Sequence, residues 1–433
     1  MAEAGSDGGD AAAARPEDRT PAFGRRAGAG PAAAARLIRT RNFGPYFVGN
    51  AASASGTWFQ NLAASLYVFE HTHSPFLLGV LQFGNFVPVL LLAPWGGSAA
   101  DRFDRKRLLL VTQVVATMVS GVLAALTWTG HVSVPLVMSC AVCLGVCSAF
   151  SAPASQALIG DLVPRDDLQS AVALNSMTFN LARAIGPSLA GLSVDKLGYA
   201  PTFAINAGSY LLLALGLLVV TPRARQLASR GQARLRESFR IAREQPRLLA
   251  FLLIVTAVGF ASDPVNTESP AFAHAFGYGH NHLRLWSGFI VGAFGLGAIA
   301  AALLLAGRVA GSRRRMMTTL LVLVAGVIGF SLSPSIWVGF GFLAVGGFGY
   351  LASNTSATSQ LMLGVEDHQR GRIMALWSIA FLGLRPIASL TDGAIAGAFG
   401  VRAAGAVLTV PALAGAAAIY FLRARDMPLT TEA

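Results

Sequence analysis

Long apolar segments, each close to twenty residues, fill most of the chain after residue 41 and limit what it can fold into. A helix needs about 20 apolar residues to cross a hydrocarbon core of roughly 30 Å. Only 12% of the 433 residues are charged and 54% are hydrophobic, so a soluble fold of this size would have too little polar surface. The segments are therefore predicted to be transmembrane helices of an all-α integral membrane protein.

The apolar segments number twelve and fall into two sets of six, separated by an arginine-rich stretch at 223–247. We expect an N-terminal six-helix bundle at 41–222 and a C-terminal one at 248–424, followed by a short tail at 425–433. The individual spans are expected near 43–70, 75–99, 107–129, 132–158, 168–194 and 199–221, and near 248–272, 283–306, 316–332, 336–361, 373–399 and 403–422.

The segments outside the bundles are expected to be cytoplasmic. Residues 1–40 are rich in Ala, Gly, Pro and Arg without apolar periodicity, which predicts a disordered tail. They also lack the apolar core of a cleaved signal peptide. In the linker, Leu235, Phe239 and Ala242 share one helical face among arginines, which favours an amphipathic helix at the membrane surface. This helix is interpreted as a tether, with a regulatory or lipid-specific site as the alternative.

Positively charged residues indicate the orientation of the chain. Lys196, Arg284 and Arg402 fall on one side of the twelve-span arrangement, and Arg183 and Arg385 fall inside spans. The other 28 of the 33 basic residues lie on the side of the two termini. Positive charge is retained in short cytoplasmic loops, so both termini are predicted to be cytoplasmic, in a multi-pass protein of the plasma membrane.

An internal repeat relates the two halves. Shifting the sequence by 202 residues without a gap superimposes span five on span eleven, including a pair of intramembrane arginines. Two pseudo-symmetric six-helix units are a standard transporter architecture. The matched pairs are Leu174 and Leu376, Ser176 and Ser378, Phe179 and Phe381, Arg183 and Arg385, Gly191 and Gly393, and Gly198 and Gly400.

Neither a nucleic acid nor a metal is expected as a partner. The net charge of +12 would favour nucleic acid in a soluble protein, but here it follows the membrane topology. Cys140, Cys143 and Cys147 lie on one helical stripe with no His or acid beside them, so they are interpreted as packing residues instead of a soft-metal site. No cofactor is expected, and a G-x-x-x-x-G-K-[ST] motif for ATP is absent from the sequence.

The loop between spans two and three, GSAADRFDRKR at 97–107, resembles the G-x-L-a-D-R-x-G-R-K signature of the major facilitator superfamily, with Ala99 and Asp104 as departures. The physical expectation is that the glycine allows close helix approach, that the acid accepts hydrogen bonds at a helix terminus, and that the basic residues anchor the loop at the cytoplasmic face. The resemblance implies the major facilitator fold and assigns conformational gating to Gly97, Asp101, Arg102, Arg105, Lys106 and Arg107.

Two further stretches narrow the resemblance. SGTWFQ at 55–60 and the segment 175–191 are similar to the branch that contains the enterobactin exporter and the macrolide-efflux proteins. Within the latter, Gly186, Pro187 and Gly191 resemble the antiporter signature of span five and are expected to pack helices closely. The resemblance implies export. Span four carries no charge from Leu144 to Pro153, unlike many drug-proton antiporters.

Ionisable residues inside spans are costly and usually face a cavity or a partner. The candidates for a substrate or ion pathway are Arg183, Arg385, Asp392, Asp263 and Glu268. Arg385 and Asp392 are seven residues apart, which places them on nearly one helix face, about 10.5 Å apart along the axis. The alternative is that these charges pair with one another, or that Asp263 and Glu268, in a proline-broken segment, lie in water.

The sequence as a whole predicts a secondary transporter that works by alternating access, most simply a proton-coupled exporter of an amphipathic small molecule such as a drug, a siderophore or another natural product. It is expected to act as a monomer in the lipid bilayer. An uptake porter or facilitator is the nearest alternative. A polytopic membrane enzyme is disfavoured, because the seven histidines are scattered and form no catalytic constellation with acids.

Overall fold

The computed structural model describes residues 31–223, 243, 245–279, 282–305, 313–365 and 370–421. Within these ranges the chain is helical and contains no strand. The N-terminal half holds six long helices, preceded by the short α1 (Pro31–Ile38). They are α2 (Phe43–Thr72), α3 (Pro75–Arg102), α4 (Arg105–Trp128), α5 (Val134–Leu162), α6 (Leu168–Leu197) and α7 (Tyr199–Val219).

The C-terminal half also crosses six times, but three of its crossings are interrupted. The first is α9 (Pro246–Thr267) followed by α10 (Ser269–Ala275), and the next three are continuous: α11 (Leu283–Leu304), α12 (Arg313–Leu332) and α13 (Ile336–Leu363). The fifth consists of α14 (Arg370–Ser378), the π-helical segment η2 (Ile379–Gly383) and α15 (Arg385–Phe399), and the sixth of α16 (Val401–Val407) and α17 (Val410–Phe421).

Ten of the described crossings are apolar and long enough to span a membrane by length and composition. The other two, α2 and α6, have 30 residues each, about 45 Å of helix, and are not among these ten. The predicted all-α membrane fold is therefore confirmed, and the described helices are consistent with the twelve predicted spans. Each predicted span corresponds to one of these crossings, with ends that differ by a few residues.

The internal repeat is visible in the backbone. Gly198 and Gly400, which are 202 residues apart, end α6 and α15 with φ angles of 87° and 89°. Their N–H groups donate to the carbonyls of Val194 and Ala396, again 202 apart, at 3.0 and 2.9 Å. Positive φ suits glycine because it has no Cβ. The repeat thus preserves the geometry of a helix end as well as the sequence.

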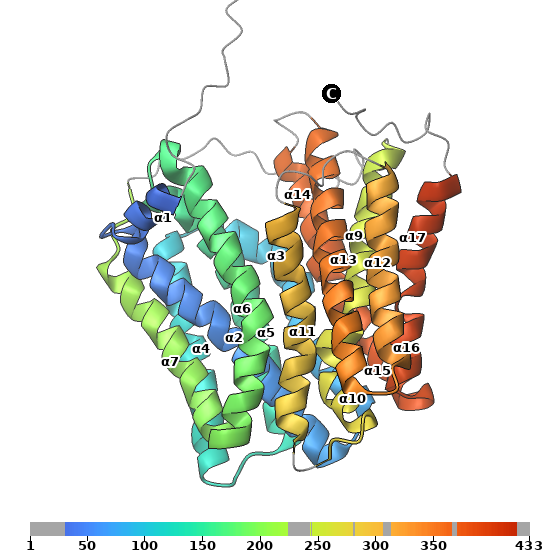
Figure 1. Cartoon of the computed structure of the whole chain (residues 1–433). Helices are drawn as coiled ribbons and strands as arrows, with labels where there is room; N and C mark the ends of the chain where they lie inside the picture. The colour runs from blue at the N-terminus through green and yellow to red at the C-terminus, as the bar shows by residue number, and fades with distance from the viewer. Residues whose placement is uncertain are drawn as a thin grey trace, which may run out of the picture.

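The two halves meet through two symmetric helix pairs, α6 with α11 and α3 with α15. A Cβ on Gly288 would lie 2.6 Å from the Pro187 carbonyl of α6, and a Cβ on Gly79 would lie 2.9 Å from the Cα of Gly393. Only glycine permits backbones to approach so closely. Figure 1 shows α6 and α11 converging toward the end at which α6 ends and α11 begins, and diverging toward the other end. We call the converging end, where α6 ends at Leu197 and α11 begins at Leu283, the joined end. The opposite end, where α3 ends at Arg102 and α4 begins at Arg105, is called the basic end.

The prediction that residues 1–40 form a disordered tail is wrong for residues 31–38. Residues 31–38 form α1, where Leu37 is 2% exposed and Arg36 pairs with Asp167 before α6 at 2.6 Å. The apolar side chain and the ion pair tie this segment to the bundle, which its alanine-rich composition did not reveal. Residues 1–30, most of the linker including Leu235, Phe239 and Ala242, and the tail at 425–433 lie outside the described residues.

Candidate functional site

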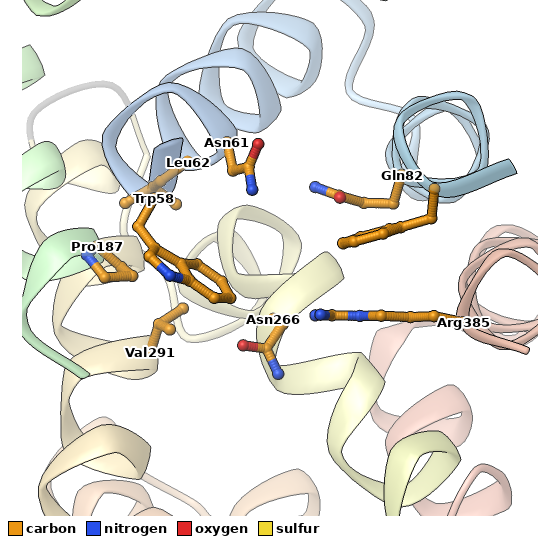
Figure 2. Close-up of a pocket in the computed structure, with 9 residues that line it drawn as sticks. Trp58, Asn61, Leu62, Gln82, Pro187, Asn266, Val291 and Arg385 are labelled. Atoms are coloured by element: carbon orange, nitrogen blue, oxygen red, sulfur yellow. The ribbon is translucent and has the colours of Figure 1, made fainter. Parts of the chain in front are cut away.

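A pocket with an empty volume of about 360 Å³, part of it open to solvent, lies between the two halves. Both halves contribute to it, and its lining combines aromatic rings, side-chain amides and one guanidinium. Figure 2 shows Arg385 reaching from α15 to the centre of the pocket, with Trp58 entering from the opposite side. The lining residues are Trp58, Asn61, Leu62, Gln82, Phe86, Pro187, Asn266, Val291 and Arg385.

Arg385 is held in the pocket by contacts from both halves. Its Nε lies 3.5 Å from Oδ1 of Asp263 on α9, a long ion pair in which the arginine side chain keeps 17% exposure. Its guanidinium also lies 4.5 Å from the ring centroid of Phe86 on α3. Asp263 is held in turn by the Thr267 hydroxyl, which donates to Oδ2 at 2.9 Å. The pairing of the intramembrane charges, left open from the sequence, is thus realised for Arg385 and Asp263.

Three carboxyl side chains are buried in the C-terminal half. Asp263, Glu268 and Asp392 are 1%, 0% and 0% exposed, so the alternative that Asp263 and Glu268 lie in water is wrong. Both carboxyl oxygens of Glu268 and of Asp392 lack a hydrogen-bond partner in the described structure. Asp263 lies on α9, Glu268 directly follows that helix, and Asp392 lies on α15, the helix whose Arg385 pairs with Asp263.

The helix break beside these carboxyls differs from its expected position. The apolar run ends near Ala261, but α9 continues through Pro264 and ends at Thr267, and Glu268 separates it from α10. A proline inside a helix costs one hydrogen bond without ending it here, and Pro270 then occupies the first turn of α10, where proline is tolerated. The break therefore places Glu268 inside the protein and not in an outer loop.

Arg183, the repeat partner of Arg385, approaches the pocket from α6. It lies one turn before Pro187, a lining residue, and therefore on the same helix face. Its guanidinium lies 4.5 Å from the ring centroid of Tyr350 and 5.8 Å from that of Trp58. It also donates a hydrogen bond to the Tyr350 hydroxyl. Within the described part of the chain no carboxylate lies within ion-pair distance of it.

The interior of the N-terminal half contains hydrogen bonds between neutral polar side chains. Ser120 donates to Oε1 of Gln60 at 2.7 Å, and Asn206 also donates to that oxygen. Ser53 donates to Gln113 at 3.2 Å. These residues, and the amides that line the pocket, were not singled out from the sequence. Their polar character within apolar spans was the available signal, and a buried amide network is costly unless every member is paired.

The signature loop at the basic end holds α3, α4, α5 and α7 together. Arg105 binds Asp161 of α5 at 3.0 Å, and Lys106 donates to the carbonyl of Val220 after α7 at 2.7 Å. Asp104 caps α4 by accepting from the N–H of Arg107 at 2.9 Å. Asp101, Arg102 and Arg107 are exposed at this end. Arg105 and Lys106 therefore tie the start of α4 to α5 and to the end of α7.

The close-approach glycine of this motif is not the one expected. A Cβ at Gly97 would meet no atom within 4 Å, whereas a Cβ at Gly96 would lie 2.1 Å from the carbonyl oxygen of Ala149 on α5. One residue along a helix rotates the side chain by about 100°, so adjacent glycines face different neighbours. An added Cβ would lie 2.9 Å from Trp58 at Gly186 and 2.5 Å from the Arg284 carbonyl at Gly191.

A bidentate ion pair links the two halves at the joined end. Arg284, at the start of α11, donates from Nε and Nη2 to the two oxygens of Glu70 on α2 at 2.7 and 2.9 Å. Its guanidinium lies 5.0 Å from the ring centroid of Tyr199, and Nη1 donates to the Val194 carbonyl at 3.4 Å. The side chains are 32% and 15% exposed. We call this contact between Glu70 and Arg284 the end latch.

The three cysteines of the stripe lie on α5 and differ in exposure. Cys140 and Cys147 are buried, Cys143 is exposed, and all three are free thiols. No group of His, Cys, Asp or Glu that could hold a metal ion occurs among the residues that the structure describes.

Comparison with known proteins agrees with this architecture. Residues 33–432 match the model of the family described as transmembrane secretion effector. The staphyloferrin A transporter of Staphylococcus aureus is 24% identical over 387 residues, which cover 87% of this chain and 95% of that protein. The multidrug efflux pump Tap of Mycolicibacterium fortuitum is 22% identical over 396 residues, with coverage of 88% and 95%.

A solved structure shares the fold. A bacterial homologue of the human lysosomal transporter Spinster, in an inward-facing and occupied conformation, superimposes with a TM-score of 0.71 at 14% sequence identity. The match covers 89% of this chain and 98% of that one. At this identity the comparison concerns the fold alone.

Proposed function

We propose that this chain, which belongs to the transmembrane secretion effector family of the major facilitator superfamily, exports an amphipathic small molecule in exchange for protons. It is a multi-pass membrane transporter of small molecules and not an enzyme. Export is supported by the family description and by the relative named as a multidrug efflux pump. A drug, a siderophore or another natural product would be the substrate.

The observation that carries proton coupling is the set of three buried carboxyls in the C-terminal half, one of which, Asp263, pairs with the pocket residue Arg385. Glu268 and Asp392 are fully buried and their oxygens have no hydrogen-bond partner in the described structure. A buried ionised carboxylate is costly, whereas a protonated one is tolerated, so such a group binds a proton when closed off and releases it when water enters. Arg385, paired with Asp263, joins this group to the substrate pocket.

The pocket chemistry supports an amphipathic substrate. Trp58 and Phe86 offer aromatic surface, and Asn61, Gln82 and Asn266 offer amide donors and acceptors. Ligand pockets typically combine an apolar lining with a few placed polar groups. Because the pocket is shared by both halves, binding there can couple to their relative motion.

Alternating access would proceed by opening the joined end and closing the basic end. The glycine contacts and the end latch hold the joined end closed in this structure. Gly97, which faces open space here, and Asp101, Arg102, Arg105, Lys106 and Arg107 are proposed to bear on the other half when the basic end closes. We place both termini in the cytoplasm and the protein, as a monomer, in the plasma membrane.

The proposal is tested with everted membrane vesicles that carry an imposed acid-inside pH gradient. A proton-coupled exporter should accumulate its substrate from a panel of drugs and siderophores, and nigericin should abolish the accumulation. Asp392→Asn should abolish it at equal protein level. Asp195→Asn, which removes a carboxylate paired with Lys196 outside the pocket, should not.

Other outcomes identify the alternatives. Accumulation only in right-side-out vesicles would show an uptake porter, and equilibration without a gradient would show a facilitator. Accumulation by Asp392→Asn that matches the parent at every pH would remove this carboxyl from the coupling step.

A further inference from the structure

The charges around the pocket are not balanced by the contacts that the structure shows. Arg385 pairs with one carboxylate, that of Asp263, through a single contact of 3.5 Å. Arg183 has a phenol hydroxyl and two aromatic rings as partners and, within the described residues, no carboxylate at ion-pair distance. Glu268 and Asp392 carry no net charge when they hold protons. With both protonated, the site retains one guanidinium without a compensating negative charge.

The two arginines belong to opposite halves, Arg385 in the pocket lining and Arg183 against the lining residue Trp58. Arg183 belongs to α6 and Arg385 to α15, and the 202-residue repeat relates their positions. Pro187 on the Arg183 face of α6, Trp58, and Arg385 itself line the same pocket. Trp58 lies against the Arg183 guanidinium at 5.8 Å. The pocket therefore has one cation in its lining, Arg385, and a second cation, Arg183, packed against its lining residue Trp58, with aromatic surface and side-chain amides in the lining.

A guanidinium without a compensating negative charge is unfavourable in a low-dielectric cavity, so its presence there indicates a function. Rings compensate a guanidinium only in part, because the face of an aromatic ring carries a partial and not a full negative charge. A buried charge without an opposite charge is strongly unfavourable, and intramembrane charges that persist usually serve a substrate or ion. A guanidinium presents paired N–H donors whose geometry matches a carboxylate.

From this arrangement we propose that the transported molecule is an organic anion whose carboxylate or similar oxyanion binds between Arg183 and Arg385, with its apolar part against Trp58 and Phe86. This inference rests on the proposed function, since it names the charge class of the molecule that the same pocket takes. An anion in this position contacts both halves at once, so it is bound most tightly when the halves are close together.

The charge class is tested by binding without transport, using protein in lipid nanodiscs. The probes are pairs of dansyl-labelled amino acids and their methyl esters, such as dansyl-leucine and dansyl-leucine methyl ester, which differ in charge but hardly in apolar surface. Wild-type protein should bind the free acid more tightly than the ester by roughly tenfold or more, the scale of a charge-assisted hydrogen bond. Arg183→Gln should abolish this preference for the free acid over the ester.

Two further variants separate recognition from folding. Arg183→Lys keeps the charge without the paired donors and should retain part of the preference for the acid. Arg39→Gln, which removes an exposed guanidinium before α2, should retain all of it. Equal binding of acid and ester in every pair, a preference for the esters, or an undiminished preference in Arg183→Gln would overturn the proposal.

The test is independent of the proposed transport reaction. Acid-selective binding without gradient-driven accumulation would leave the anion site standing and refute proton-coupled export. Accumulation of neutral or cationic drugs, with no acid preference in the binding assay, would do the reverse.

Discussion

At the residue scale, the buried carboxyl of Asp392 lowers the stability of the folded protein. Asp392 is fully buried, and neither of its carboxyl oxygens has a hydrogen-bond partner in the described structure. A buried polar group that lacks a partner costs about 1–3 kcal/mol. Residues held at such a cost are characteristic of functional sites, where stability and activity oppose each other.

Removing this carboxyl should therefore not reduce stability. Asp392→Ala loses a small volume but also an unpaired polar group, so we expect an unchanged or higher melting temperature together with lost transport. Asp161→Ala is the matched control, because it breaks the 3.0 Å ion pair with Arg105 and should lower stability by up to about 1 kcal/mol. Thermal unfolding in detergent measures both. A large destabilisation by Asp392→Ala would make this residue structural.

The sequence identified the intramembrane charged residues but not which of them contact one another. Arg385 and Asp392 could be placed on one helix face from their spacing. The pairing of Arg385 with Asp263, 122 positions away, depends on how α15 packs on α9, which no local pattern encodes. The amides of Asn61, Gln82 and Asn266 were equally visible as letters, but only the packing of the two halves brings them into one pocket.

At the scale of helices, the two halves differ in one element although the sequence repeat has no gap. The π-helical segment η2 stands immediately before Arg385, whereas α6 is a continuous helix at the corresponding positions 177–181. The N–H of Leu384 reaches back to the carbonyl of Ile379 at 3.1 Å, and Thr256 of α9 donates to the Ala380 carbonyl at 3.2 Å. Such segments occur frequently at functional sites. Since the repeat has no gap, the sequence did not predict it.

The adjacent glycines at the end of α3 provide a matched test of helix packing. Gly96→Ala would place a Cβ 2.1 Å from the Ala149 carbonyl, so α3 and α5 must separate, at a cost of about 1–3 kcal/mol. Gly97→Ala meets open space and should be neutral or slightly stabilising, because alanine favours a helix over glycine. Thermal unfolding distinguishes the two.

The transport rate of Gly97→Ala tests the gating assignment separately from stability. If Gly97→Ala is as stable as the parent but slow, Gly97 makes its close contact in the state whose basic end is closed, as the gating assignment requires. Equal destabilisation by both substitutions would contradict the packing described here.

At the scale of the whole molecule, the two halves rest on each other at one end. The pairs of glycines at 79 and 393 and at 191 and 288 repeat the same close contact about the pseudo-twofold axis. The end latch adds a bidentate ion pair across the same end. The span count, the two halves and the repeat could be predicted from the sequence because hydropathy is local. Which end is closed depends on long-range packing and could not.

The central claim is that the halves alternate about the pocket, and interspin distances at both ends test it most directly. After replacement of Cys140, Cys143 and Cys147, one labelled pair joins positions 196 and 399 at the joined end, and another joins 103 and 363 at the basic end. Glu70→Gln removes the bidentate pair, which contributes about 1 kcal/mol at this partial exposure and should shift the equilibrium roughly fivefold.

The account predicts reciprocal changes in the distance distributions. In Glu70→Gln the population with a longer 196–399 distance should grow, and the population with a shorter 103–363 distance should grow by the same fraction. Alkaline pH, which ionises the buried carboxyls as water reaches them, should act in the same direction. Distances that stay unchanged at both ends, or that lengthen at both ends together, would contradict alternating access in this protein.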